Sequence, residues 1–210
     1  VVANHEFDLG ARNLATQFGG YGGYDLLAAN YDFESWNLPW ATELEKMIKP
    51  SNIYELDGLR VGVIGLANVS SLNSIYDESN SLGIQVEEPG TVIPREAAKL
   101  RSQGADLVIV VSHMGLDDDQ EQALQMSDID IFMGGHHHVA INPPLVITNE
   151  ETGKRIPVVH SGAFAKFVGR LDVVVRDGEV LSHKYKLIPV DSNVVTAEQE
   201  SPEVNDILEE

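Results

Sequence analysis

Histidine is the residue type whose placement in this sequence points most directly to chemistry. Six of the seven histidines come within about one or two residues of the end of a predicted strand, and only His183 lies inside one. In open α/β sheets, ligands bind beyond the carboxyl ends of the strands. Three separate strands deliver histidine to one rim, and neutral imidazoles suit Zn, Mn, Fe, Co or Ni, so the pattern indicates a metal site. The six are His5, His113, His136, His137, His138 and His160.

The segment Gly134-Gly135-His136-His137-His138 is the densest cluster. Its two glycines let the backbone turn sharply after the apolar run 129–133. Side chains two residues apart in an extended chain point the same way, so His136 and His138 are expected to face one pocket while His137 faces away. The alternative, accidental surface polarity, is disfavoured because the segment directly follows a buried strand.

The segment Asn4-His5-Glu6-Phe7-Asp8 offers a second kind of chemistry. His5 and Asp8 are three residues apart, so a helical start brings the carboxylate to the imidazole. A carboxylate partner orients the ring and suits it to act as a general acid or to stabilise a transition state. Asn4 offers a neutral carbonyl ligand. The alternative is an ordinary helix start with Asp8 as a capping acid.

The elements that must position these residues alternate between strand and helix over the first two thirds of the chain. Apolar runs predict strands at 25–30, 60–67, 106–112 and 129–133, and helical periodicity predicts helices at 9–18, 91–103 and 119–126. The last third is predicted as an antiparallel meander with strands at 145–148, 156–160, 168–175 and 180–188, and with Asp177-Gly178 as a hairpin turn. The order predicts an α/β fold.

Composition excludes several classes of protein. The 210 residues include 33 Asp and Glu against 14 Lys and Arg, a net charge of −19, which disfavours binding to duplex nucleic acid. There is no cysteine, so a disulfide scaffold, a thiolate zinc site and a cysteine nucleophile are excluded. No apolar run approaches the 18 or so residues of a membrane span. An anionic substrate would need a local source of positive charge.

The boundaries of the chain predict one domain and a tail. Residues 1–190 are expected to form one domain, which the resemblance described below makes a partial catalytic domain that lacks its first strands, and 191–210 an acidic linker or tail without Lys or Arg. Val1-Val2 resembles the end of a buried strand that enters a functional loop. We therefore expect a segment upstream of Val1.

Three motifs together resemble the calcineurin-like metallophosphoesterases, in particular the branch of bacterial 5′-nucleotidases and 2′,3′-cyclic-nucleotide phosphodiesterases. They are the segment from Asn4 to Asp8, the segment Ser112-His113-Met114-Gly115, and the segment from Gly134 to His138, in this order and at these separations. The resemblance covers nearly the whole chain. It implies an α/β sandwich of two mixed sheets flanked by helices, here incomplete at the N-terminus.

The resemblance also implies residue roles. Asn4, His113 and His136 match ligands of one divalent metal, and His138 matches a ligand of a second. His5 and Asp8 match the catalytic dyad. His137 and Glu6 receive no role, and no substrate-binding residue is assigned; His160 is a further candidate for the site. Ala3 stands where the family normally has Gly.

The remaining ligands in the family come from an Asp-X-His strand end and a Gly-Asp pair, and neither motif occurs upstream of Asn4. The resemblance therefore implies that an N-terminal segment, on the same polypeptide or on another chain, completes the site.

The activity implied is that of a phosphoester hydrolase with two metal ions (Zn, Mn, Fe or Co). It would be 5′-nucleotidase-like, releasing phosphate from nucleotides or other small phosphoesters by attack of a metal-bridging hydroxide. One alternative is a related hydrolase of another ester or a sulfur-linked substrate. Another is a truncated or inactive metal-binding domain in a larger assembly. The family analogy places the protein in the periplasm, at the cell surface or in the medium.

Overall fold

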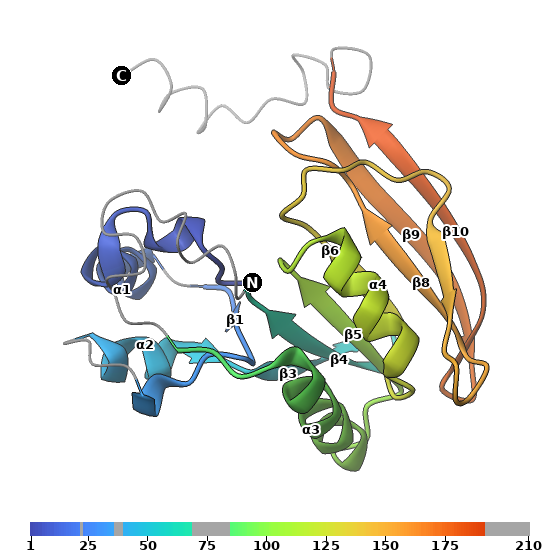
Figure 1. Ribbon diagram of the computed structural model, residues 1–210, viewed down its shortest axis with the longest axis horizontal. Helices are drawn as coiled ribbons and strands as arrows, with labels where there is room; N and C mark the ends of the chain where they lie inside the picture. Colours follow the sequence, from blue (N-terminus) through green and yellow to red (C-terminus); the bar gives the residue numbers. More distant parts are fainter. Residues whose placement is uncertain (22, 36–39, 69–84, 192–210) are drawn as a thin grey trace.

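A mixed six-stranded sheet forms the centre of the molecule (Figure 1). The computed structural model describes residues 1–21, 23–35, 40–68 and 85–191. The strand order is β3-β4-β5-β6-β8-β7, with the inner strands β4, β5, β6 and β8 parallel and the two edge strands antiparallel to their neighbours. The strands are β3 (Ser51–Leu56), β4 (Leu59–Leu66), β5 (Leu107–Ser112), β6 (Ile131–Gly134), β7 (Leu145–Thr148) and β8 (Arg155–His160).

Two helices cover the same face of this sheet, α3 (Pro89–Ser102) and α4 (Leu116–Gln125). The predicted apolar face of α3, which consists of Ile93, Ala97 and Leu100, is buried in one cluster with Val108 and Val110 of β5. Alternate residues of a strand point to the same face of the sheet, so the even-numbered valines of β5 meet the helices. The structure confirms an α/β fold in which helices flank a mixed sheet.

A second apolar cluster surrounds the N-terminal segment. It packs Val2 and Phe7 against α1 (Gly10–Tyr21) and α2 (Ala41–Met47). A short parallel pair, β1 (Leu26–Leu27) and β2 (Ile48–Lys49), lies beside it. Two 3-10 turns, η1 (His5–Phe7) and η2 (Phe33–Ser35), complete this part. Val1-Val2 was predicted to end a strand; it is in no strand, but the Val2 N–H donates to the Leu27 carbonyl at 3.0 Å.

A long antiparallel hairpin ends the described chain, with strands β9 (Phe167–Arg176) and β10 (Glu179–Pro189). Asp177 and Gly178 form its turn as predicted, with φ of 53° and 77°. Two positive φ values in succession are typical of the turn that matches the twist of a hairpin. None of the described helices combines the length and the apolarity that a membrane crossing requires.

Several predicted elements differ from the structure. The predicted strand 25–30 shrinks to the two residues of β1, and α2 and β3 were not predicted. The meander was wrong for β8, which pairs in parallel with β6. The physical reason is burial, since Ile156 and Val158 are 0% exposed and suit an inner strand. Of the predicted tail 191–210, residues 192–210 lie outside the described part of the chain.

Phe132→Ala in β6 is expected to lower the free energy of unfolding by about 3–5 kcal/mol, because Phe132 is 0% exposed in the core between sheet and helices and its loss leaves a cavity. Chemical denaturation measures the change. Leu56→Ala is the control, since Leu56 is 59% exposed and its truncation is expected to stay within about 0.5 kcal/mol. Equal stability of the two variants would refute this description of the core.

Candidate active site

The loops that follow β5 and β6 carry four of the histidines at one end of the sheet. β5 and β6 are parallel neighbours, with Val111 opposite Met133, so the chain leaves both strands at the same edge. His113 comes directly after β5 and His136 two residues after β6, and their ring centroids are 5.1 Å apart. The sheet therefore brings together two of the predicted ligands from segments more than twenty residues apart.

Burial and neighbouring imidazoles lower the pKa of both His113 and His136. Burial is the largest cause that lowers the pKa of His113, followed by the charge of His136, while the Glu6 carboxylate opposes the shift. Burial is also the largest cause that lowers the pKa of His136, and the charges of His137 and His138 come next. A lowered pKa leaves the ring deprotonated at neutral pH, which is the form that binds metals.

The N-terminal segment reaches the same rim (Figure 1). The His5 ring acts on the pKa of both His113 and His136, so it lies within electrostatic range of both. His5 Nδ1 is 2.9 Å from Asp8 Oδ2, which is the contact that their spacing predicted. The His5 side chain is 65% exposed and Asp8 34%, so the pair is open to an incoming molecule.

Asn4, the residue before His5, is buried. It is 1% exposed, and its side-chain Oδ1 has no hydrogen-bond partner among the described residues. Glu6, which received no role in the sequence analysis, accepts a hydrogen bond from the Ala3 N–H at 2.6 Å. The buried Tyr31 hydroxyl donates to the Ala3 carbonyl at 3.3 Å. These two contacts hold the backbone from which Asn4 and His5 project.

The loop 136–138 is not extended, contrary to the prediction. His136 and His138 have φ of 74° and 57°, and the His137 N–H donates to the Gly135 carbonyl at 3.0 Å. The His137 Nδ1 accepts a hydrogen bond from the Leu116 N–H at the start of α4, at 3.1 Å. The left-handed backbone at two positions, not strand alternation, sets the directions of the rings.

His138 borders an exposed aromatic side chain. Its ring centroid is 5.1 Å from that of Phe164, which is 79% exposed on the loop between β8 and β9. Lys166 Nζ lies 5.7 Å from the same Phe164 ring, a distance at which a cation and a ring attract. The sequence analysis did not identify Phe164 or Lys166. A signal was available, because both follow the end of a buried strand.

His160, the further candidate, is not part of this rim. It is 2% exposed, and its Nε2 is 2.8 Å from Asp119 Oδ2 in α4. A side chain at Gly134 would collide with both partners, so β6 passes directly over this pair. The pair fixes α4 against the strand that leads into the loop 136–138. Asp119 was missed because sequence spacing does not relate it to His160.

Two asparagine side chains form hydrogen bonds with the backbone of the loops at the same end of the sheet. The Asn30 side chain both donates to the Ala67 carbonyl, at 3.0 Å, and accepts from its N–H, at 2.9 Å. Asn68 Nδ2 donates to the Met114 carbonyl at 2.7 Å, next to His113. Asn30 and Asn68 are buried, so these bonds are shielded from water and limit the movement of the loops.

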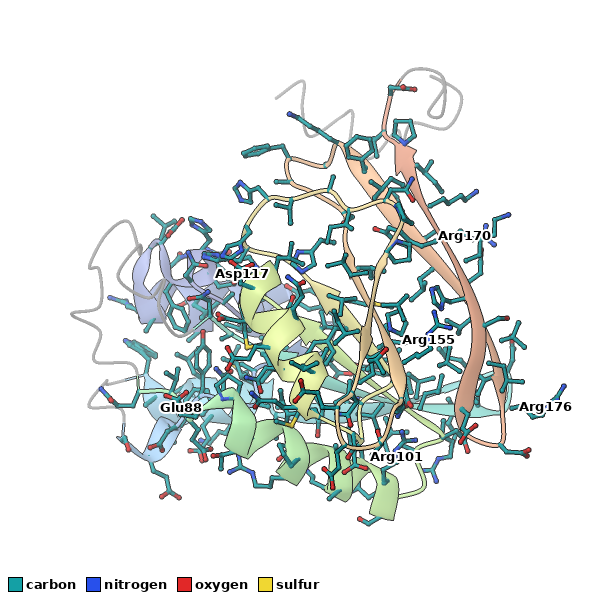
Figure 2. The ribbon with its side chains drawn as sticks, turned by 45° about the vertical axis from the view of Figure 1, so that its right-hand side comes forward. Glu88, Arg101, Asp117, Arg155, Arg170 and Arg176 are labelled. Atoms are coloured by element: carbon teal, nitrogen blue, oxygen red, sulfur yellow. The ribbon has the colours of Figure 1, made fainter. Side chains whose placement is uncertain are left out.

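Figure 2 shows Asp117 at the start of α4, with Arg155, Arg170 and Arg176 to its right, toward the β9–β10 hairpin, and Arg101 of α3 below it and to the right. Within the described ranges, no three His, Asp or Glu side chains are grouped so that they could hold a metal ion.

Comparison with known proteins shows what the sequence and the fold are similar to. No protein-family model matches the chain. A 5′-nucleotidase of Diplobatis ommata is 26% identical over 206 residues, which cover 92% of this chain and 35% of the relative. The crystal structure of a 5′-nucleotidase precursor from Thermus thermophilus superposes with a TM-score of 0.77 at 27% identity, covering 89% of this chain and 38% of that one. The chain is a homologue of the 5′-nucleotidases.

The fold of this 5′-nucleotidase homologue is that of the calcineurin-like phosphoesterases. The calcineurin-like phosphoesterase YfkN from Bacillus subtilis superposes with a TM-score of 0.68 over 92% of this chain and 64% of its own, at 21% identity. The chain spans only about a third of the length of the curated 5′-nucleotidases that it matches.

Gly134→Ala is expected to lower the free energy of unfolding by about 1–3 kcal/mol, because the added methyl group collides with the Asp119–His160 pair. Gly19→Ala in α1 is the matched control, since a methyl group there meets nothing and alanine favours a helix by about 0.5–1 kcal/mol. Urea unfolding of both variants measures the effect. A Gly134→Ala variant as stable as the parent would show that β6 does not pass over the pair in this way.

Proposed function

We propose that the chain is part of the catalytic domain of a phosphoester hydrolase that releases phosphate from nucleotides, as a 5′-nucleotidase does. One observation carries the proposal: His113 and His136 meet at the ends of two adjacent parallel strands, and the His5–Asp8 pair lies within electrostatic range of them. The homology to 5′-nucleotidases supports the choice of substrate class.

The described residues fit a divalent metal at Asn4. A buried carbonyl oxygen that lacks a hydrogen bond destabilises a fold by about 1–3 kcal/mol, and Asn4 Oδ1 is such an atom. A cation would satisfy it. The imidazoles of His113 and His136 are neutral and thus suited to the same ion. We assign Asn4, His113 and His136 to one metal and His138 to a second.

These four side chains do not complete two metal sites. We propose that a segment upstream of Val1, on the same polypeptide or on another chain, supplies the remaining ligands.

Divalent metals, when bound, would polarise the phosphoryl group and lower the pKa of a bound water toward roughly 7. The periplasmic, cell-surface or secreted location implied by the family resemblance stays a prediction.

The chain's own contribution to the chemistry centres on His5. Asp8 accepts a hydrogen bond from Nδ1, which fixes the ring, and in the doubly protonated imidazolium form Nε2 carries a second proton. From the rim, Nε2 can donate that proton to the leaving oxygen of a phosphoester or stabilise the charge on the phosphoryl oxygens. The exposure of His5 lets a substrate reach it, and the buried Asn4 keeps its backbone in place.

A phosphate-release assay tests the function. The protein expressed from its complete gene, supplied with Mn²⁺, is expected to release phosphate from nucleoside 5′-monophosphates. Cyclic nucleotides, other phosphate esters and sulfur-linked substrates complete the panel, and turnover of the cyclic and sulfur-linked substrates is read from loss of the substrate by chromatography, because their hydrolysis releases no free phosphate. Turnover of one of these alone would favour the related hydrolase. Mn²⁺ binding without any turnover would make the chain a metal-binding domain and refute the proposal.

Substitutions separate the proposed roles. His5→Ala is expected to lower turnover by about 10²–10⁴-fold with bound metal unchanged, because it removes a proton donor and no ligand. His113→Ala and His136→Ala are expected to lower the metal content itself. Elemental analysis beside turnover measures both. His183→Ala is the control, since His183 lies in β10, opposite Val173 of the hairpin. Unchanged metal in both ligand variants would contradict the assignment.

A further inference from the structure

His137 is the residue of the loop 136–138 that the proposed function leaves without a role. Its Nδ1 lies 3.1 Å from the Leu116 N, the first residue of α4. A backbone N–H can only donate, so Nδ1 accepts this bond and the neutral ring carries its proton on Nε2. The imidazole therefore joins the loop after β6 to the start of a helix that comes earlier in the chain.

The start of α4 is shaped to receive this ring. The residue before Leu116 is Gly115, which has φ of 111° and no side chain that could cap the helix. A Cβ at Gly115 would stand 2.5 Å from His137 Cε1 and Nε2, so only glycine leaves room. The first N–H groups of a helix lack partners within the helix, and His137 supplies one from outside.

The loop needs such a contact. His136 and His138, on either side of His137, both have positive φ, a conformation that residues with a Cβ adopt rarely and only when their surroundings enforce it. The rings of His136 and His137 are 5.4 Å apart at 42°, so a shift of one ring displaces the other. Anchoring the ring of His137 to α4 thus fixes the directions of its two neighbours.

We propose that His137 is a positioning residue: by accepting the hydrogen bond from Leu116, it holds the loop so that His136 and His138 face a divalent metal. The proposal rests on the metal site of the proposed function. It predicts that the acceptor atom of His137, rather than its charge or its bulk, is what the site requires.

The test compares the Mn²⁺ affinity of the parent protein with that of two variants at position 137. Each protein is expressed from its complete gene, freed of metal and titrated with Mn²⁺ in a calorimeter. His137→Phe keeps the volume but removes the acceptor, and is expected to weaken Mn²⁺ binding about tenfold. His137→Asn places its Oδ1 at the same number of bonds from the backbone as Nδ1, so its affinity is expected within about threefold of the parent. The melting temperature of the metal-free His137→Phe variant is expected to fall by no more than a few degrees, because one hydrogen bond at a helix start stabilises the fold only slightly.

A second pair of variants addresses the donor. Leu116→Pro removes the N–H at the first helical position, where proline is well tolerated, and is expected to weaken Mn²⁺ binding as His137→Phe does. Leu116→Ala keeps the N–H and controls for the lost side chain. The double variant of Leu116→Pro and His137→Phe is expected to bind no more weakly than the weaker single variant, because both changes break one bond.

Three results would overturn the positioning role. The first is parent-like Mn²⁺ affinity in His137→Phe. The second is the loss of one bound Mn²⁺ in His137→Asn, which would make His137 a ligand. The third is a fall in the melting temperature of His137→Phe of more than about 10 °C, which would show that the substitution disrupts the fold as a whole. A parent protein that binds no Mn²⁺ would overturn the proposed metal site and this role together, so the two failures are distinguishable.

Discussion

The parallel register of β4, β5 and β6 is the constraint on which the candidate site depends. Leu66 of β4 pairs with Ser112 of β5, and Val111 of β5 with Met133 of β6, so three strands end level with one another. Inner strands of such a sheet are apolar on both faces, and a shift by one residue would turn buried side chains toward the wrong layer. The packing of valines and isoleucines against α3 and α4 therefore fixes the strand register, and the register determines where His113 and His136 meet.

Buried polar contacts hold the loops and the helix α4 in place at the end of the sheet where the histidines lie. Asn30 binds the backbone of Ala67, Asn68 that of Met114, and His160 the Asp119 carboxylate, each away from solvent. Such groups are costly to bury unless they are paired, so each contact stabilises a single arrangement of its loop. Gly134 allows the closest of these approaches, since its missing side chain leaves space for the Asp119–His160 pair. The loop that carries three successive histidines thus begins at a strand end that is packed closely against this buried pair.

Acidic side chains gather at the start of α4, the helix that follows His113 in the chain. Asp117, Asp118 and Asp119 lie in the first turn of α4, where acids interact favourably with the helix dipole. The pKa of Asp118 is raised, mainly by burial and by the neighbouring Asp119. The pKa values of His113 and His136 are lowered, so these rings add no charge at neutral pH. In a chain of net charge −19, an anionic phosphoester would therefore rely on bound cations, in agreement with the proposed metals.

The sequence by itself determined the periodic elements and the local pairs. It identified α3, β4, β5 and β6, the hairpin turn at Asp177-Gly178, and the contact of His5 with Asp8, because these depend on spacing along one segment. It failed for β8, which it placed in a meander, and for the backbone of His136 and His138, which it took as extended. Only the tertiary structure decided the burial of Asn4, the pairing of His160 with Asp119 and the contact of His137 with Leu116. Each of these depends on which strands become neighbours and on how α4 packs against them, and that choice is made by burial over the whole sheet rather than by any local pattern of residues.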